Sequence, residues 1–93
     1  MIVRFVKLEI QNQHIDDFKA LTAGEKEDIV AFEGCSFLEI LQDVNNKNLF
    51  FSHSHWQSED ALNRYRESDF FRGNWTQVKE WFAEKPEAWS LER

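Results

Sequence analysis

The segment LFFSHSHWQSEDAL, residues Leu49 to Leu62, holds the change from one type of secondary structure to another. Its first eight residues alternate between two sets of side chains, one with Phe50, Ser52, Ser54 and Trp56 and the other with Phe51, His53 and His55. Such alternation is typical of a β-strand. Ser58 can then cap a helix, and Glu59 and Asp60 suit its first turn because the helix dipole favours negative charge there. The segment therefore predicts a strand followed at once by a helix.

The flanking sequence predicts three more strands from the same alternation. They are expected over Ile2–Ile10, Cys35–Val44 and Glu87–Glu92. In the last of these, Ala88, Trp89 and Leu91 are expected to point inward. The polar run between Val44 and Leu49 is rich in residues that tolerate positive φ, which favours a hairpin turn.

The remaining segments predict helices. The first begins at a cap, Asn12 or His14, and is ended by Gly34, which adopts a left-handed conformation at low cost. A fresh cap at Ser68-Asp69 divides the later helical region into two segments. Lys85-Pro86 stops this region, because proline cannot continue a helix.

The resulting order is strand, helix, strand, strand, helix, strand, which is the ferredoxin-like βαββαβ arrangement with an antiparallel sheet, an α+β fold. Ninety-three residues suit a single domain, residues 1–93. Helices can cover only one face of such a sheet. The other face carries either the set with His53 and His55 or the set with Trp56, and both sets are too aromatic to stay fully wet. We therefore expect a homodimer in which two sheets pack together.

The composition narrows the class of protein. The chain is 42% hydrophobic and 30% charged, which excludes a disordered chain and a membrane protein. Its net charge of −6 repels phosphate groups, so neither nucleic acid nor a membrane is expected as a partner. Aromatic residues reach 15%, more than so short a chain can bury alone, which indicates a partner subunit or a ligand cavity. With a single cysteine, Cys35, and no signal peptide, we expect a cytoplasmic location.

Several motifs carry a resemblance to a known family. The stretch Ser54–Leu62, followed by Tyr65-Arg66 and Ser68–Phe71, resembles the strand-Trp-x-Ser-x-x-Ala-Leu signature of the antibiotic biosynthesis monooxygenase (ABM) family. Phe32–Cys35 is similar to the start of that family's second strand, and the match extends to Trp89–Leu91. The resemblance implies one ABM-like domain and a dimeric α+β barrel.

Proteins similar to this chain have several activities, so the site must decide between them. They include cofactor-independent oxygenases of quinol or polyketide rings, haem-degrading enzymes, small isomerases and domains without known activity. The haem-degrading branch carries an iron-binding histidine where this chain has Trp75, and an asparagine where it has Val6, which disfavours haem breakdown. Glycine-rich phosphate loops are absent from the sequence. We therefore expect no cofactor.

The resemblance places Trp56 in the wall of a pocket between sheet and helices, although it would also suit the core. Near such a wall, a phenol, a guanidinium and an amide could orient a phenolate and hold its charge. The candidate catalytic residues are Trp56, Tyr65, Asn74 and Arg72, and the candidate substrate-binding residues are Ser52, Ser54, Trp75 and Phe71.

Two functions follow as hypotheses. The first is a cofactor-independent monooxygenase that acts on a small electron-rich aromatic substrate with molecular oxygen. The second is a noncatalytic dimeric ligand-binding or structural protein of the same fold. His53 and His55 share a strand face and could form half of a metal site, but no third ligand is evident because His14 starts a distant helix. Packing at the dimer face or action as a catalytic base remain open for this pair, and we expect no metal.

Overall fold

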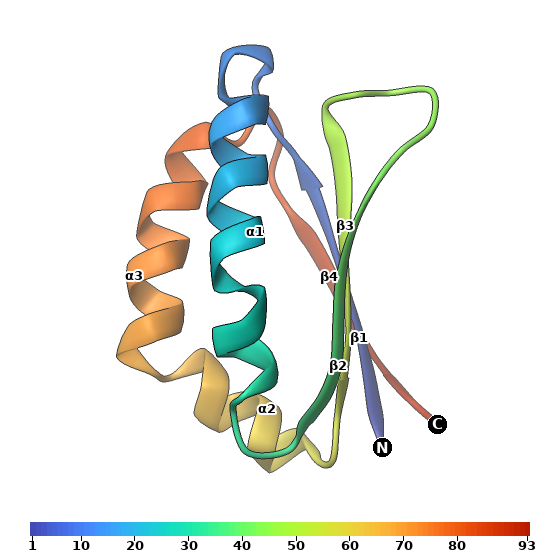
Figure 1. The fold of residues 1–93 in the computed structure, drawn as a ribbon. Coiled ribbons are helices and arrows are strands. Elements are labelled where there is room, and N and C mark those ends of the chain that lie inside the picture. The colour runs from blue at the N-terminus through green and yellow to red at the C-terminus, as the bar shows by residue number, and fades with distance from the viewer.

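Four antiparallel strands and three α-helices form the fold, and the computed structural model describes all residues 1–93. The strands are β1 (Ile2–Glu9), β2 (Cys35–Gln42), β3 (Leu49–Trp56) and β4 (Glu87–Glu92), in the sheet order β2-β3-β1-β4. The helices are α1 (Ile15–Val30), α2 (Glu59–Arg66) and α3 (Asp69–Val78), with short 3-10 turns η1 (Asn12–His14) and η2 (Lys79–Trp81). Figure 1 shows all helices on one side of the sheet. The predicted α+β, ferredoxin-like fold is confirmed.

Two strands end earlier than predicted. β2 ends at Gln42 and not at Val44, because the carboxylate of Asp43 accepts hydrogen bonds from the backbone N–H groups of Asn45 and Asn46, at 2.9 and 2.8 Å. These bonds begin the turn early, as is common for aspartate. β1 ends at Glu9, and the next residue forms only an isolated bridge to Phe82.

Serine hydroxyls start both later helices. The Oγ of Ser58 accepts a hydrogen bond from the backbone N–H of Ala61 at 3.2 Å, and that of Ser68 accepts one from Phe71 at 3.1 Å. The Ser68 hydroxyl also donates to the backbone carbonyl of Tyr65 at 2.6 Å, so one side chain closes α2 and opens α3. The predicted division of this region into two helices is confirmed.

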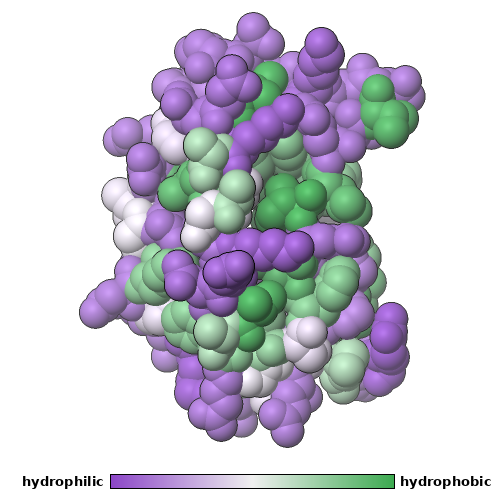
Figure 2. All heavy atoms as spheres, viewed as in Figure 1, coloured by the Kyte–Doolittle hydropathy of each residue, from purple (hydrophilic) through white to green (hydrophobic).

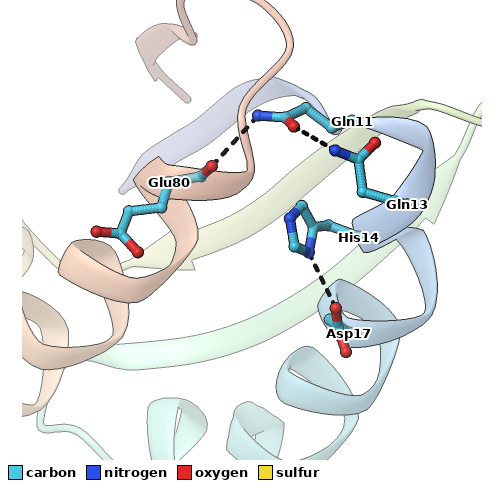
Figure 3. Close-up of polar contacts among 5 residues, drawn as sticks. All are labelled: Gln11, Gln13, His14, Asp17 and Glu80. Carbon is cyan, nitrogen blue, oxygen red and sulfur yellow. Dashed lines mark hydrogen bonds and ion pairs between the residues drawn. The ribbon is translucent and has the colours of Figure 1, made fainter.

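The start of α1 differs from the expected cap. His14 occupies the N-cap position, but its side chain makes no capping hydrogen bond. Its Nδ1 instead lies 3.0 Å from the carboxylate of Asp17 (Figure 3), which is a stronger partner because it is charged. Beside it, the Gln11 side chain donates to the backbone carbonyl of Glu80 at 3.3 Å and so joins the chain before α1 to η2.

Burial decides which side chains of the sheet face the helices. Phe50, Ser54 and Trp56 of β3 are buried, so the alternate residues of that strand point to the uncovered face. The prediction for β4 was wrong in part. Trp89 and Leu91 pair with residues of β1 on the uncovered face, and their side chains are 44% and 50% exposed. Both point outward because β4 also alternates.

Two apolar clusters hold the helices against the sheet. The first contains Leu8, Ile10, Phe18, Phe50 and Val78. The second contains Ile29, Leu38, Trp56, Ala61 and Leu62. Figure 2 shows hydrophilic residues over much of the surface, with hydrophobic ones gathered toward its middle. None of the helices has both the length and the apolar character needed to cross a membrane.

Gly34 makes the connection from α1 to β2. Its φ is 89°, and it is the only residue of the chain with a positive φ. Its carbonyl oxygen accepts a hydrogen bond from the backbone N–H of Gln57 at 2.7 Å. A Cβ at this position would collide with the Cβ of Ala61 in α2. The absence of a side chain therefore allows this turn to contact the start of α2.

Candidate functional site

A cavity of about 340 Å³ lies between the sheet and the helices. This is within the usual size range of small-molecule sites, which are roughly 300–1,000 Å³. Of the 22 residues that line it, 13 are hydrophobic, so a bound molecule would meet mostly apolar surface and a few polar groups. The lining comes from β1, β2, β3, all three α-helices and the residues at the start of β4.

The cavity brings together most of the residues that the sequence indicated. Its lining includes Ser52, Ser54, Trp56, Tyr65, Phe71, Asn74 and Trp75. Arg72 does not line it and is exposed. The reason is helical geometry, because residues 71, 74, 75 and 78 share one side of α3 and residue 72 is turned about 100° away from residue 71.

Trp56 belongs to both the core and the cavity. Its side chain is 1% exposed and packs in the second apolar cluster. Its indole N–H donates to the hydroxyl of Ser54 at 3.0 Å, and its ring stacks on Tyr65 with centroids 5.0 Å apart. The indole therefore has its donor satisfied and one face covered by Tyr65, and it contributes to the cavity lining beside that ring.

Aromatic rings continue from Tyr65 along one wall of the cavity. Tyr65 meets Phe71 edge to face with centroids 5.1 Å apart, and Phe71 stacks on Trp75 with centroids 5.6 Å apart and an interplanar angle of 17°. Trp75 in turn meets Phe82 edge to face at 5.4 Å. Such a row of rings offers stacking surface to a flat aromatic molecule.

Two arginines of the lining were not predicted from the sequence. Arg4 of β1 and Arg66 of α2 both line the cavity, and neither forms an ion pair with a carboxylate. Arg4 donates to the hydroxyl of Ser90 at 2.8 Å, and burial followed by the nearby charge of Arg66 lowers its pKa. The sequence did contain an indication of this. Arg4 and Val6 are two residues apart on the same strand, so both side chains point to the face that the helices cover.

Glu25 is the other residue that the sequence interpretation missed. It lines the cavity from α1, and its Oε2 atom is buried without a hydrogen-bond partner. Burial, and secondly the charge of Asp28, raises the pKa of this carboxyl to about 7. The signal was its spacing, because residue 25 falls on the same stripe as the buried Phe18, Thr22 and Ile29.

Replacing Glu25 with glutamine is expected to stabilise the fold at neutral and higher pH. The folded-state pKa lies above the ordinary value of 4.5, so folding favours the protonated form. The contribution of Glu25 to stability is therefore full below pH 4.5 and is lost as the pH rises through about 7. At pH 8 the free energy of unfolding of the Glu25→Gln variant should be about 1–2 kcal/mol higher than that of the wild type, allowing for partial exposure.

Urea denaturation at pH 4 and pH 8 measures this difference. Glu27→Gln is the matched control, because Glu27 lies on the exposed side of the same helix. Equal stability of Glu25→Gln and the wild type at both pH values would contradict the argument.

The two histidines of β3 lie outside the cavity. His53 Nδ1 is 3.2 Å from Glu39 Oε1, and His53 Nε2 is 3.1 Å from His55 Nε2. Phe5 stacks on His53 with centroids 4.5 Å apart. Burial, with smaller contributions from His53 and Arg93, lowers the pKa of His55. The chain presents no group of three or more histidine, cysteine or acidic side chains arranged to hold a metal ion.

Comparison with solved structures agrees with this architecture. A conserved protein from Methanosarcina mazei Go1 superposes with a TM-score of 0.92 at 20% identity, over 100% of this chain and 93% of that one. A protein of Nitrosomonas europaea named "Putative antibiotic biosynthesis monooxygenase" gives a TM-score of 0.93 at 18% identity, over 100% and 98%. At these identities the likeness shows the shared fold alone. No curated protein matches the chain by sequence.

The sequence itself identifies the family. The sequence model described as "Antibiotic biosynthesis monooxygenase" matches residues 1–73, which include the segment from Ser54 to Leu62 and the aromatic wall as far as Phe71. The match covers well over half of the chain and confirms the resemblance seen in the motifs up to residue 73, whereas the motif at Trp89–Leu91 lies outside it. The chain therefore belongs to the antibiotic biosynthesis monooxygenase family.

Proposed function

We propose that the cavity binds a small planar, electron-rich aromatic substrate, such as a quinol or a polyketide-like ring, and that the chain is a cofactor-independent monooxygenase. The observation that carries this proposal is the wall of contacting aromatic rings formed by Tyr65, Phe71 and Trp75 along a mostly apolar cavity. Membership of the family supports the general class of reaction. The substrate class is inferred from the shape and polarity of the lining.

The proposed reaction requires few catalytic groups from the protein. The anion of an electron-rich ring transfers an electron to O₂, and the resulting pair combines to form the new carbon–oxygen bond. Because no reductant takes part, the substrate supplies all four electrons that convert O₂ into one inserted oxygen atom and one water molecule. The protein has to hold the ring, remove a proton and exclude bulk water. Scarcity of catalytic groups is compatible with this mechanism.

The polar lining would serve the charge on that anion. Arg4 and Arg66 have no carboxylate partner, and Arg4 uses only one of its N–H groups for Ser90. Both guanidinium groups therefore keep donors that can bind a negative oxygen. The side chains of Ser52 and Asn74 also line the cavity and can form hydrogen bonds. In this proposal, the aromatic wall binds the ring and the arginines stabilise its anion.

The test combines ligand binding with oxygen consumption. Wild type is titrated with hydroquinones and naphthols, and oxygen uptake is measured against a protein-free control. Trp75→Leu should weaken binding about five- to tenfold, because it removes a stacking ring while keeping an apolar side chain. Arg72→Ala, an exposed change on the same helix, should bind as the wild type does.

The outcome distinguishes the two functions. Binding with faster oxygen uptake supports the monooxygenase. Binding without faster uptake favours the noncatalytic ligand-binding protein of the same fold. Failure of the whole panel to bind would contradict both the proposed substrate class and the role of the aromatic wall.

We further propose that the uncovered face of the sheet packs against a second copy of the chain. This face carries Leu41, Trp89 and Leu91, each of which is 44% exposed or more, together with Phe5 and the histidine pair. A protomer alone would leave these apolar groups in water, at a cost that association removes. We place the dimer in the cytoplasm, where the single Cys35 would stay reduced.

A further inference from the structure

An unpaired carboxylate oxygen in the cavity points to a particular feature of the ligand. Glu25 Oε2 is out of contact with solvent and receives no hydrogen bond from the protein. A buried polar oxygen without a donor is unfavourable, and most such atoms in folded proteins have a partner. Glu25 also lines the cavity, so a rotation of its side chain would turn this oxygen toward a bound molecule, which can supply the donor.

We propose that Glu25 is the general base of the cavity, which accepts the proton of an aromatic hydroxyl group presented to its unpaired oxygen. The inference rests on the proposed function, because it requires an aromatic ligand in the same cavity. The hydroxyl O–H bond breaks, a new H–O bond forms on the carboxylate, and the electron pair stays on the ligand oxygen. The product is the aromatic anion that can react with O₂.

The surroundings of Glu25 suit this role. Its pKa of about 7 keeps a sizeable fraction ionised near neutral pH while leaving it basic enough to take a proton. Tyr65 cannot compete as a base, because burial, and secondly the charge of Glu25, raises its pKa and keeps the phenol protonated. The protonated hydroxyl of Tyr65 is able to donate a hydrogen bond to a ligand but not to remove its proton.

Other charged groups near the cavity define the electrostatic setting. Asp28 on α1 raises the pKa of Glu25, which makes the carboxylate a better base. The other charged residues of the lining are Arg4 of β1, Arg66 of α2 and Glu87 of β4. The two arginines favour the anion that the proton transfer creates. The cavity thus combines a proton acceptor with cations for the product.

The proposal predicts selection for a hydroxyl group over its methyl ether. 2-Naphthol and 2-methoxynaphthalene have the same ring, but only the first can donate to Glu25. The ionised carboxylate binds the donor better than the protonated form does, so affinity for 2-naphthol should rise about tenfold between pH 6 and pH 8. Affinity for the ether should not rise.

Titrations of both probes at pH 6 and pH 8, followed by fluorescence, test the assignment. The rise for 2-naphthol should disappear in Glu25→Gln, which cannot ionise, and persist in the exposed control Glu27→Gln. Excited 2-naphthol is a strong acid. At pH 8, where Glu25 is mostly ionised, bound 2-naphthol should emit as the naphtholate in the wild type and mainly as the neutral naphthol in Glu25→Gln.

The results separate the two proposals. If Glu25→Gln keeps the pH-dependent rise, or if the ether shows the same rise, the role of Glu25 is overturned while aromatic binding in the cavity stands. If neither probe binds the wild type, both the proposed ligand class and the role of Glu25 are overturned. Loss of the rise in Glu25→Gln alone, with the ether still bound, supports the assignment.

Discussion

Replacement of Gly34 with alanine is expected to lower the free energy of unfolding by about 3 kcal/mol. Two effects add at this position. The φ of 89° costs an L-residue roughly 1–2 kcal/mol, and the new methyl group would overlap the Cβ of Ala61, with a cost of about 1–3 kcal/mol for overpacking. Denaturant unfolding of wild type and variant measures the loss.

Gly24→Ala provides the matched control. Gly24 lies inside α1, and a Cβ there would meet no atom within 4 Å. Alanine should therefore stabilise the helix by roughly 0.5–1 kcal/mol. Ala61→Gly alone should lose roughly 0.5–1 kcal/mol, because glycine is unfavourable inside a helix. Once this cost is subtracted, adding Ala61→Gly to Gly34→Ala should recover the part of the loss that comes from the overlap and leave the part that comes from φ. A Gly34→Ala variant as stable as wild type would contradict the whole argument.

Introducing a charge on the uncovered sheet face is expected to separate the proposed dimer. Sedimentation of the wild type at micromolar concentration should give about 22 kDa, twice the 11.2 kDa of one chain. Trp89→Glu should sediment as a single chain, because a symmetric interface would have to bury two unpaired carboxylates, one from each copy. The protomer should stay folded, since Trp89 is 44% exposed within it.

Val44→Glu separates a specific effect from a general one. Val44 is 94% exposed in the turn between β2 and β3, so the same change in charge and polarity occurs away from the sheet face. This variant should remain a dimer. A monomeric wild type, or a Trp89→Glu variant that still dimerises, would rule out this face as the interface.

Local patterns were sufficient to predict the fold because strands and helices here obey their periodicities. Alternation located β3, and the caps at Ser58 and Ser68 located both later helices. The inward direction expected for Trp89 failed because the prediction treated large apolar residues as buried, whereas its register with Phe5 places it on the uncovered face. The register between β4 and β1 decides which face Trp89 occupies, and a local sequence pattern holds no information about that register.

The candidate site could be predicted only in its aromatic part. Trp56, Tyr65 and Trp75 belong to apolar stripes, so periodicity leads to them. Glu25 and Arg4 occupy the same kind of inward position, but a charged residue there is easily assigned to solvent because burial of charge is unfavourable. Glu25 and Arg4 belong to the candidate site because they line a cavity that several helices and strands enclose together, and this enclosure is a property of the whole fold. Arg72 had the expected chemistry but lies on the wrong side of α3.

The break at Ser68 explains why the cavity has a continuous aromatic wall. In an unbroken α-helix, Tyr65 and Phe71 are six residues apart, and at about 100° per residue their side chains would point about 120° away from each other. In this fold their rings touch, because the helix stops and restarts in a new direction between them. A single serine hydroxyl, bonded to both helices, thereby re-aims one ring toward the other. In a relative in which α2 and α3 form one straight helix, rings at these two positions would not meet, and an aromatic wall would require residues at other positions.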